Sequence, residues 1–285
     1  MTPYLELKKR IQECIPHLNT NNGLHVYYRG HSDNSWLIKP SICRNNDEKQ
    51  NENRMLLEQL KNGNWDIQRS LFENIAHLQH YGIHTRFLDY TTNADVAIYF
   101  ACEKHVEKDA EIIACAYDLR SLDYRDTIII TELALLKEPI IVSDFVQKIV
   151  AKYPELKRKD NSYISLEEDL GLSVLSWIDH GFMVTPSLKD YEHMKEWNPR
   201  IWNQKGAFFV PGNKTVPPFP KPFSRSINTT TILPEIADIP STITHCDYIY
   251  HFHIPKDQKT AILEELATEK GINRSFIYPD LSTTS

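Results

Sequence analysis

Apolar residues recur every three or four positions in several stretches of the chain. Residues 4–18 and 66–81 place leucines and isoleucines on one face at this spacing, which predicts an amphipathic helix in each. Residues 94–104 and 255–270 follow the same pattern. Gly82 comes directly after residue 81 and is expected to end that helix, because glycine adopts the left-handed conformation of a helix terminus easily.

Shorter segments are rich in aromatic and β-branched residues, which favour strands. These segments are residues 24–29, 85–90, 112–117, 207–210 and 248–254. A further strand is expected at the start of residues 127–136, where three isoleucines are consecutive. Helices and strands follow one another without regular alternation, so the pattern favours an α+β fold over a doubly wound parallel sheet.

We expect a single domain with four parts. Residues 1–22 are expected to form an N-terminal helix, and residues 24–140 are expected to form the core. Residues 144–198 mix helical segments with charged patches, which predicts a helical insertion. Residues 199–285 are expected to hold the C-terminal strands, a proline-rich arm and the last helix, because seven prolines fall within residues 211–240.

Glycine is scarce, and its positions exclude one class of nucleotide site. The chain has 285 residues but only nine glycines, and no two glycines are separated by a single residue. It therefore contains no G-x-G-x-x-G, and no glycine precedes Lys-Ser or Lys-Thr at phosphate-loop spacing. A nucleotide bound by this chain has to be held by side chains rather than by a glycine-rich loop.

Cysteine content favours a cytoplasmic location, and the net charge bears on possible partners. The formal net charge of -6 argues against bulk nucleic-acid binding, although it allows a local basic groove. The five cysteines are scattered without a C-x-x-C motif, as expected for reduced thiols. No run of about 18 apolar residues is present, so neither a membrane span nor a membrane partner is expected.

The first segment that suggests chemistry is Tyr28-Arg29-Gly30, where an arginine lies near the end of an aromatic strand. The planar guanidinium group suits phosphate or carboxylate. Two interpretations are open. Arg29 binds an anionic ligand, or it forms a structural pair with Asp33 or Asp89.

The second segment spans residues 78–93 and is dense in hydrogen-bonding side chains, although it lies between apolar helices. Buried polar groups need a partner from the protein or from a ligand. The candidate pocket residues here are His80, Thr85, Arg86, Asp89, Thr91 and Thr92. The alternative interpretation is a helix cap together with a buried Arg86–Asp89 pair.

The third segment places Arg200 and Gln204 just before a predicted strand. A different cluster, His77, His80 and His84, has the spacing of metal ligands on a helix. Because the helix is expected to end before His84, no metal is expected.

Taken together, these segments resemble the FRG-domain family over about residues 24–282, nearly the whole chain. The matching motifs, in family order, are Tyr28-Arg29-Gly30, Trp36, Pro40-Ser41 with Arg44, Gln79-His80-Tyr81-Gly82, Thr85 to Asn93, Ala97 to Ala101, Arg200, Gln204 to Phe208, Gly271-Ile272 and Tyr278 to Leu281. Tyr28 stands where the family has its eponymous phenylalanine.

The order of the motifs is also similar to that of ADP-ribosyltransferase-like enzymes. This similarity implies a central, split, antiparallel-rich sheet and NAD as the substrate. It implies that Arg29 grips a phosphate or ribose of NAD, and that Thr91 and Thr92 build the wall around the nicotinamide ribose. The remaining binding residues implied are Tyr28, Gly30, His80, Thr85, Arg86 and Arg200.

Gln204 lies where this resemblance places a catalytic glutamate. Breaking the glycosidic bond of NAD develops positive charge on the ribose, which a carboxylate stabilises better than an amide does. Either Asp89 supplies the carboxylate, or the site binds a nucleotide without turnover.

The expected function is that of a nucleotide-binding ADP-ribosyltransferase or NAD glycohydrolase in bacterial or phage conflict, with a protein or nucleic-acid target. One alternative is a non-catalytic module that binds a nucleotide or RNA through the same pocket. The other is a protein-interaction domain whose polar core is structural.

Overall fold

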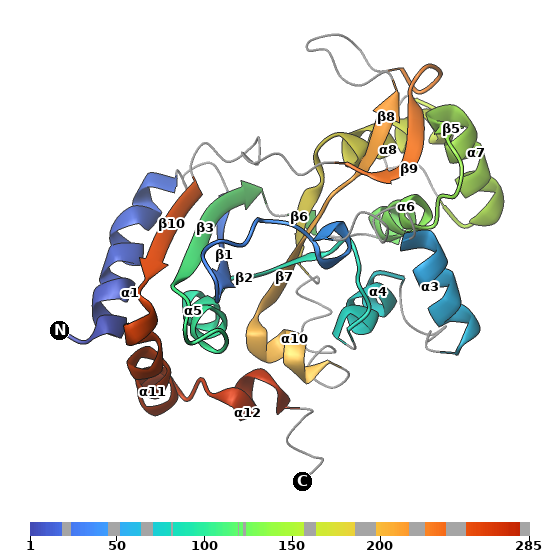
Figure 1. The fold of residues 1–285 in the computed structure, drawn as a ribbon. Helices are drawn as coiled ribbons and strands as arrows, with labels where there is room; N and C mark the ends of the chain where they lie inside the picture. The colour runs from blue at the N-terminus through green and yellow to red at the C-terminus, as the bar shows by residue number, and fades with distance from the viewer. Residues whose placement is uncertain are drawn as a thin grey trace.

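Helices surround two sheets in this protein, and Figure 1 shows how they are arranged. The computed structural model describes residues 1–18, 24–44, 52–63, 71–80, 82–118, 120–121, 124–156, 164–185, 198–216, 226–237 and 249–279.

The larger sheet has seven strands in the order β10-β3-β1-β2-β7-β6-β4. Its strands are β1 (Leu24–His31), β2 (Leu88–Thr91), β3 (Ala110–Asp118), β4 (Arg120–Ser121), β6 (Phe182–Thr185), β7 (Gly206–Val210) and β10 (Ile249–Ile254). The smaller sheet consists of β5 (Ile140–Ile141), β9 (Thr231–Ile236) and β8 (Asn213–Val216). All neighbouring strands are antiparallel except β4 and β6. The prediction of mixed helices and antiparallel-rich sheets is confirmed.

Strand pairing in the larger sheet is shortest near its centre, where β1 and β2 meet. β1 is in register with β3 along all eight of its residues. By contrast, β1 and β2 share one registered pair, Tyr28 opposite Thr91. Next to this pair, Nη1 of Arg29 donates a hydrogen bond to the carbonyl oxygen of Asp89 at 2.5 Å and so links the two strands.

The likeness of this fold to the ADP-ribosyltransferase fold stays a prediction.

Three helices cover one face of the sheet beside β10, β3 and β1. Helix α5 (Ala94–Cys102) packs on β1 and β3, α11 (Lys259–Lys270) packs on α5, and α1 (Pro3–Cys14) packs on α11 and β10. Helix α5 lies so close to β1 that a Cβ at Gly30 would come within 2.1 Å of the carbonyl oxygen of Ala97. Packing against α5 alone therefore requires a glycine at position 30.

A second group of helices packs around its own apolar core, to the right in Figure 1. These helices are α3 (Glu52–Lys61), α4 (Leu71–His80), α6 (Tyr124–Ala134), α7 (Val142–Lys152) and α8 (Leu166–His180). Gly82 follows α4 with a φ of 84°, in agreement with its expected role at a helix end. The insertion expected over residues 144–198 is mostly helical where it is described, and the division of the chain into four parts stays a prediction.

The strand expected at the start of residues 127–136 is wrong, because this segment belongs to helix α6. Three consecutive isoleucines, Ile128, Ile129 and Ile130, are each at most 2% exposed. A helix buried around its circumference lacks the alternation of polar and apolar positions that marks a surface helix. The run of β-branched residues therefore indicated a strand.

The proline-rich arm expected over residues 211–240 contains strands β8 and β9, so this prediction is wrong for that part. Pro234 is tolerated in β9 because the register of the two strands shifts between Asn213 and Thr215, close to the point opposite the proline. Proline lacks an N–H group and is compatible with such an irregularity. Residues 217–225 and 238–240 of the stretch lie outside the described residues.

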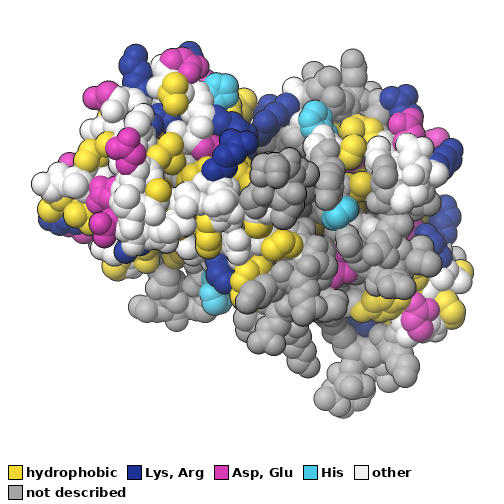
Figure 2. Space-filling view, turned by 90° about the horizontal axis from the view of Figure 1, so that it is seen from below, with side chains coloured by type: hydrophobic (Ala, Val, Ile, Leu, Met, Phe, Trp, Pro, Cys, Tyr) yellow, Lys and Arg dark blue, Asp and Glu magenta, His cyan; other side chains and the backbone are white. Residues whose placement is uncertain are grey.

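The surface carries charges of both signs. On the face shown in Figure 2, basic and acidic side chains are interspersed over the described residues. Among the helices that the structure describes, none has the length and apolar character needed to cross a membrane.

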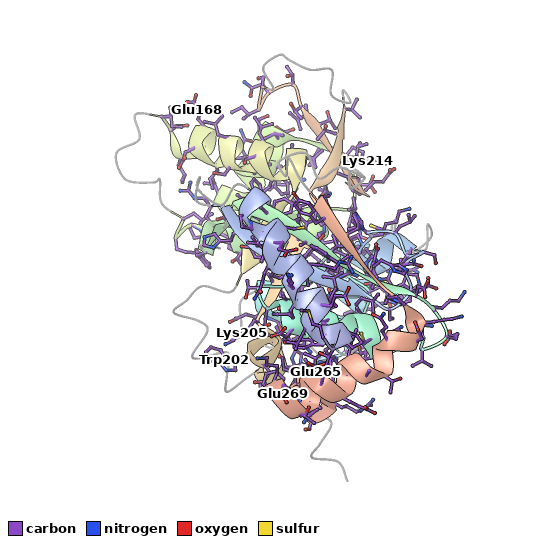
Figure 3. The ribbon with its side chains drawn as sticks, turned by 90° about the vertical axis from the view of Figure 1, so that its left-hand side faces the viewer. Glu168, Trp202, Lys205, Lys214, Glu265 and Glu269 are labelled. Atoms are coloured by element: carbon purple, nitrogen blue, oxygen red, sulfur yellow. The ribbon has the colours of Figure 1, made fainter. Side chains whose placement is uncertain are left out.

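Two short helices near the C-terminus hold each other in place. They are α10 (Pro199–Gln204) and α12 (Arg274–Ile277). Nδ2 of Asn203 donates to the carbonyl oxygen of Phe276 at 2.7 Å. At the end of α10, the ammonium of Lys205 lies 4.1 Å from the ring centre of Trp202, and both residues are labelled in Figure 3. The shorter 3-10 turns are η1 (Ile15–Leu18), η3 (Ser41–Arg44) and η4 (Lys256–Gln258).

Arg86 is a structural residue of the second helical group. Its side chain is 1% exposed, and its Nη2 lies 2.7 Å from Oε2 of Glu52. Nη1 donates to Oδ1 of Asn213 at 2.8 Å. Arg86 thus links α3 to the start of β8. Both its predicted place in a nucleotide pocket and the alternative pair with Asp89 are wrong, because Glu52 on a distant helix is the acidic partner.

Replacing Arg86 is expected to affect stability rather than ligand binding. Arg86→Met should lower the free energy of unfolding by about 3–5 kcal/mol, because it leaves a carboxylate buried without its cation. Urea denaturation measures this loss. The double variant Glu52→Leu/Arg86→Met should recover part of it, because it removes both charges.

Arg54→Met is the matched control, because Arg54 lies on α3, the helix that also carries Glu52. Arg54 pairs with Glu58 at the surface, at 3.9 Å, and its loss should change stability by less than about 1 kcal/mol. A loss of similar size for Arg86→Met would contradict the structural role of Arg86.

Candidate functional site

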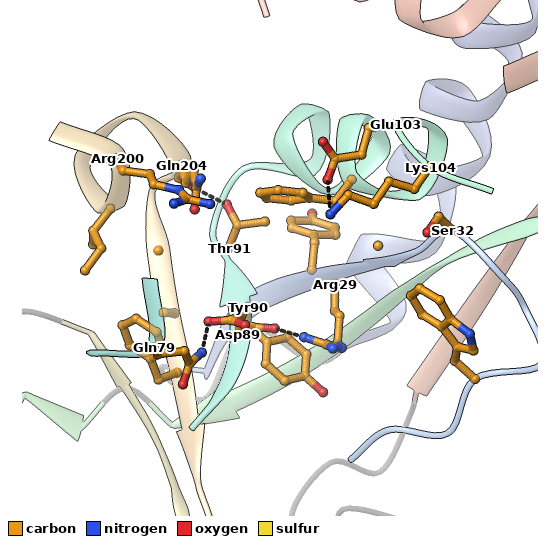
Figure 4. Close-up of a pocket in the computed structure, with 18 of the residues that line it drawn as sticks. Arg29, Ser32, Gln79, Asp89, Tyr90, Thr91, Glu103, Lys104, Arg200 and Gln204 are labelled. Atoms are coloured by element: carbon orange, nitrogen blue, oxygen red, sulfur yellow. Dashed lines mark hydrogen bonds and ion pairs between the residues drawn. The ribbon is translucent and has the colours of Figure 1, made fainter. Parts of the chain in front are cut away.

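A cavity of about 340 Å³ opens beside the junction of β1 and β2 (Figure 4). This volume is at the lower end of the range of roughly 300–1,000 Å³ typical of small-molecule sites. The described lining includes the cations Arg29, Arg44, Lys104 and Arg200, the carboxylates Asp89 and Glu103, and the aromatic residues Tyr28, Trp36, Tyr90, Phe100 and Phe208. The cavity therefore combines an excess of positive charge with aromatic walls.

Two hydrogen bonds fix the guanidinium of Arg29. Nε donates to Nε2 of His31 at 3.0 Å, and Nη1 donates to the carbonyl oxygen of Asp89. Nη2 has no hydrogen-bond partner within the part of the chain that the structure describes. Because Arg29 lines the cavity, its remaining N–H groups are available to an anion there. The guanidinium is thus oriented before any ligand arrives.

The imidazole of His31 holds Arg29 only when it is neutral, because Nε2 must accept the hydrogen bond. Burial lowers the pKa of His31, and the charge of Arg29 acts in the same direction, whereas the hydrogen bond with Glu111 opposes them. Nδ1 of His31 lies 3.1 Å from Oε1 of Glu111, which places the proton of the neutral ring on Nδ1.

Glu111 is shared between two histidines on neighbouring strands. Nδ1 of His251 lies 2.9 Å from Oε2 of Glu111. Partial burial would raise the pKa of Glu111, but the hydrogen bonds with His251 and His31 outweigh it and bring the pKa to about 2. The same hydrogen bond raises the pKa of His251. An ionised Glu111 therefore anchors a row of side chains that leads from β10 across β3 to Arg29.

Asp89 presents a carboxylate to the cavity and remains open to solvent. Nε2 of Gln79 donates to its Oδ1 at 2.5 Å, and the buried hydroxyl of Thr85 donates to Oε1 of Gln79. Thr85 thus positions Gln79, which in turn orients the carboxylate. Partial desolvation by the surrounding protein raises the pKa of Asp89, whereas the charge of Arg29 opposes this effect.

Gln204 is engaged by its neighbours on both its main chain and its side chain. Its carbonyl oxygen accepts a hydrogen bond from Oγ1 of Thr91 at 2.7 Å. Its Nε2 donates to the carbonyl oxygen of Ile277 at 3.0 Å. The side-chain amide therefore helps to hold α12 in place, although the residue also lines the cavity.

Arg200, Tyr278 and Glu103 form a second charged wall. The guanidinium carbon of Arg200 lies 4.5 Å from the ring centre of Tyr278. The hydroxyl of Tyr278 donates to the carboxylate of Glu103, with oxygen distances of 2.7 and 2.8 Å. Burial raises the pKa of Tyr278, and the charge of Glu103 raises it further, so the hydroxyl stays protonated and continues to donate.

The structure brings most of the predicted site residues to this cavity. Those that line it are Tyr28, Arg29, Gly30, Asp89, Thr91, Arg200 and Gln204. Thr85 is fully buried beneath Gln79, and Thr92 is exposed outside the described lining. The side chain of His80 lies outside the described residues. The chemical roles assigned to these residues stay predictions.

Several lining residues were absent from the predicted site. Trp36, Arg44 and Gln79 occur in the motifs that carry the family resemblance, so their signal was present. Glu103 and Lys104 follow helix α5 and belong to no motif. The one available signal is their position. Glu103 and Lys104 are the first and second residues after α5, and α5 packs against β1, which carries Tyr28-Arg29-Gly30.

Comparison with known proteins identifies one family. Residues 24–110 match the FRG domain, and this range contains Arg29, Asp89, Thr91, Glu103 and Lys104. Neither curated proteins nor solved structures give a significant match. In the part of the chain that is described, no group of three or more His, Cys, Asp or Glu side chains is placed to hold a metal ion.

The carboxylate of Glu111, which His31 and His251 share, makes the stability of the protein depend on pH. The folded pKa of Glu111, about 2, lies below its ordinary value of 4.5, so the stabilisation is present above pH 4.5 and is lost as the pH falls towards 2. Glu111→Gln should remove roughly 2–3 kcal/mol at pH 7 and flatten this acid limb. Chemical denaturation between pH 2 and pH 7 measures both.

Glu13→Gln is the control, because Glu13 is exposed and forms a surface pair with Lys9 at 3.9 Å. It should leave the acid limb unchanged. If Glu111→Gln behaves like this control, then Glu111 does not anchor the row behind Arg29.

Proposed function

Because the chain belongs to the FRG-domain family, we propose that it is a nucleotide-binding enzyme that uses NAD, either as an ADP-ribosyltransferase or as an NAD glycohydrolase. One observation carries this proposal above all. A carboxylate held by Gln79 and a guanidinium held by His31 lie side by side in one cavity.

The charges and walls of the cavity suit a nucleotide. Arg29, Arg44 and Lys104 supply cationic donors for phosphate oxygens, and no glycine-rich loop is needed. Trp36 is 38% exposed and meets the ring of His105 edge-on at 5.2 Å. Its indole is therefore fixed at the mouth of the cavity, where a base can stack on it.

Asp89 is the residue that we assign to the chemical step. When the bond between C1′ of the ribose and the nicotinamide nitrogen breaks, its electron pair leaves with nicotinamide and positive charge develops on the ribose. The carboxylate of Asp89 stabilises this charge. Water or a nucleophile of the target then bonds to C1′ and loses its proton, giving ADP-ribose or an ADP-ribosylated target.

The contacts of Gln204 support Asp89 as the carboxylate. The amide of Gln204 carries no negative charge and already donates to Ile277. We therefore assign Gln204 to support of the cavity wall rather than to catalysis. The target is a protein or nucleic acid, and we place the reaction in the cytoplasm during bacterial or phage conflict.

A non-catalytic nucleotide- or RNA-binding module is the second candidate. It is favoured by the position of Gln204, where an acidic side chain is expected of a transferase. This candidate keeps the binding roles of Arg29 and Trp36 but predicts no release of nicotinamide.

Incubation with NAD, followed by chromatography of released nicotinamide, tests the proposal. Wild-type protein should release nicotinamide, and Asp89→Asn should slow the release by at least about a hundredfold, because the charge that stabilises the transition state is lost. Arg29→Gln should mainly raise KM, because it removes a phosphate contact.

Lys214→Gln is the matched control, because Lys214 lies on β8 away from the cavity and pairs with Glu235 at 3.5 Å. Its activity should equal that of the wild type. Binding of NAD without any nicotinamide release would favour the non-catalytic module, and the absence of both would refute the two nucleotide functions.

A further inference from the structure

The guanidinium of Arg200 has no hydrogen-bonding partner among the residues that the structure describes. Its Nε is buried, and none of the residues that the structure describes accepts a hydrogen bond from it. One face of the group is covered by the ring of Tyr278. A buried charged donor without an acceptor destabilises the folded protein, so such a group calls for an explanation. The terminal N–H groups of Arg200 have no acceptor among the described residues either, and a ligand in the cavity that Arg200 lines would supply one.

Tyr278 fixes the orientation of this guanidinium. A guanidinium stacked on an aromatic ring keeps its N–H groups in its own plane, where they can reach an anion at its edge. The ring is itself fixed, because its hydroxyl donates to Glu103. Tyr278, directly after α12, and Glu103, directly after α5, thus orient Arg200, just as His31 and the main chain of β2 orient Arg29.

The two arginines approach the cavity from different elements. Arg29 extends from β1 and Arg200 from α10, and Figure 4 shows Asp89 beside Arg29 and Arg200 beside Gln204. Desolvation raises the pKa of Asp89, and the positive charges of Arg29 and Arg200 both oppose this effect. An anion in the cavity is repelled by the carboxylate of Asp89 and attracted to each guanidinium.

The charge of the cavity points to a ligand with two anionic groups. Its described lining has two more cations than carboxylates. A nucleoside monophosphate carries about two negative charges, but it has one phosphate group and can pair with only one of the two arginines. A nucleoside diphosphate has two phosphate groups, so each arginine can pair with one of them.

We propose that Arg29 and Arg200 each bind one phosphate of a nucleoside diphosphate, so that the site selects diphosphates over monophosphates. The inference rests on the nucleotide-binding function proposed above. Arg29 takes the single phosphate of a monophosphate, because its guanidinium is fixed by two hydrogen bonds.

Calorimetric titration of the full chain with ADP and with AMP tests this inference. Wild-type protein should bind ADP at least about tenfold more tightly than AMP, because one more charged contact is made. Arg200→Gln should weaken ADP binding at least about tenfold and change AMP binding less than about threefold. Arg29→Gln should weaken the binding of both nucleotides.

Arg274→Gln is the matched control. Arg274 also lies over the ring of Tyr278, at 5.9 Å, but it is not among the described residues that line the cavity. This variant should bind ADP like the wild type. Arg200→Lys keeps the charge without the planar group and should restore part of the ADP affinity, which separates loss of the contact from loss of the fold.

Three results would overturn the inference: equal affinity of the wild type for ADP and AMP, equal weakening of both nucleotides by Arg200→Gln, or no ADP binding at millimolar concentration. The outcome is separable from that of the NAD assay. The expected ADP pattern without nicotinamide release would support the diphosphate site and refute only the enzyme. Nicotinamide release with a binding pattern independent of Arg200 would refute only the diphosphate site.

Discussion

The hydrogen bond between Arg29 and the carbonyl oxygen of Asp89 joins the two halves of the larger sheet where their strands barely pair. A sheet that continued in register across β1 and β2 would leave no opening between these strands. Because they share only the pair of Tyr28 and Thr91, a charged side chain can lie between them and reach the cavity. The same interaction thus holds the fold together and brings a cation to the site.

Polar and charged side chains behind Arg29 continue this arrangement from the cavity towards β10. The neutral imidazole of His31 accepts from Arg29, and the ionised Glu111 fixes the tautomer of His31 and also binds His251. Three side chains on three neighbouring strands therefore determine the orientation of one guanidinium. This arrangement reduces the reorganisation required when an anion binds, which is how preorganised sites gain affinity.

The sequence predicted the larger elements well where their pattern was simple. Helix α1 was found because it has one buried and one polar side. Helix α5 and strand β1 were found from the spacing and type of their apolar residues, although both elements are buried on more than one side. Helix α6 was mistaken for a strand in part, because it is buried on all sides and its isoleucines carry no periodicity. Strand β9 was missed because Pro234 argues against a strand unless the irregularity opposite it is known.

The site was predicted in outline but not in its partners. Arg29 and Asp89 were recognised from their motifs, yet Arg86, only three residues before Asp89, points away to Glu52. Sequence distance cannot show this, because the partner comes from a helix more than 30 residues earlier in the chain. Glu103 and Lys104 were missed for a related reason, since only the packing of α5 against β1 brings the end of that helix to the cavity.

The most direct test of the central claim is the NMR signal of the arginine Nε–H groups during titration with ADP-ribose. The signal of Arg29 should shift in proportion to the bound fraction, because its guanidinium gains a phosphate partner in the cavity. The signal of Arg86, buried against Glu52, should stay in place and serves as the internal reference. An unchanged Arg29 signal in a protein saturated with ADP-ribose would contradict a nucleotide site at the junction of β1 and β2.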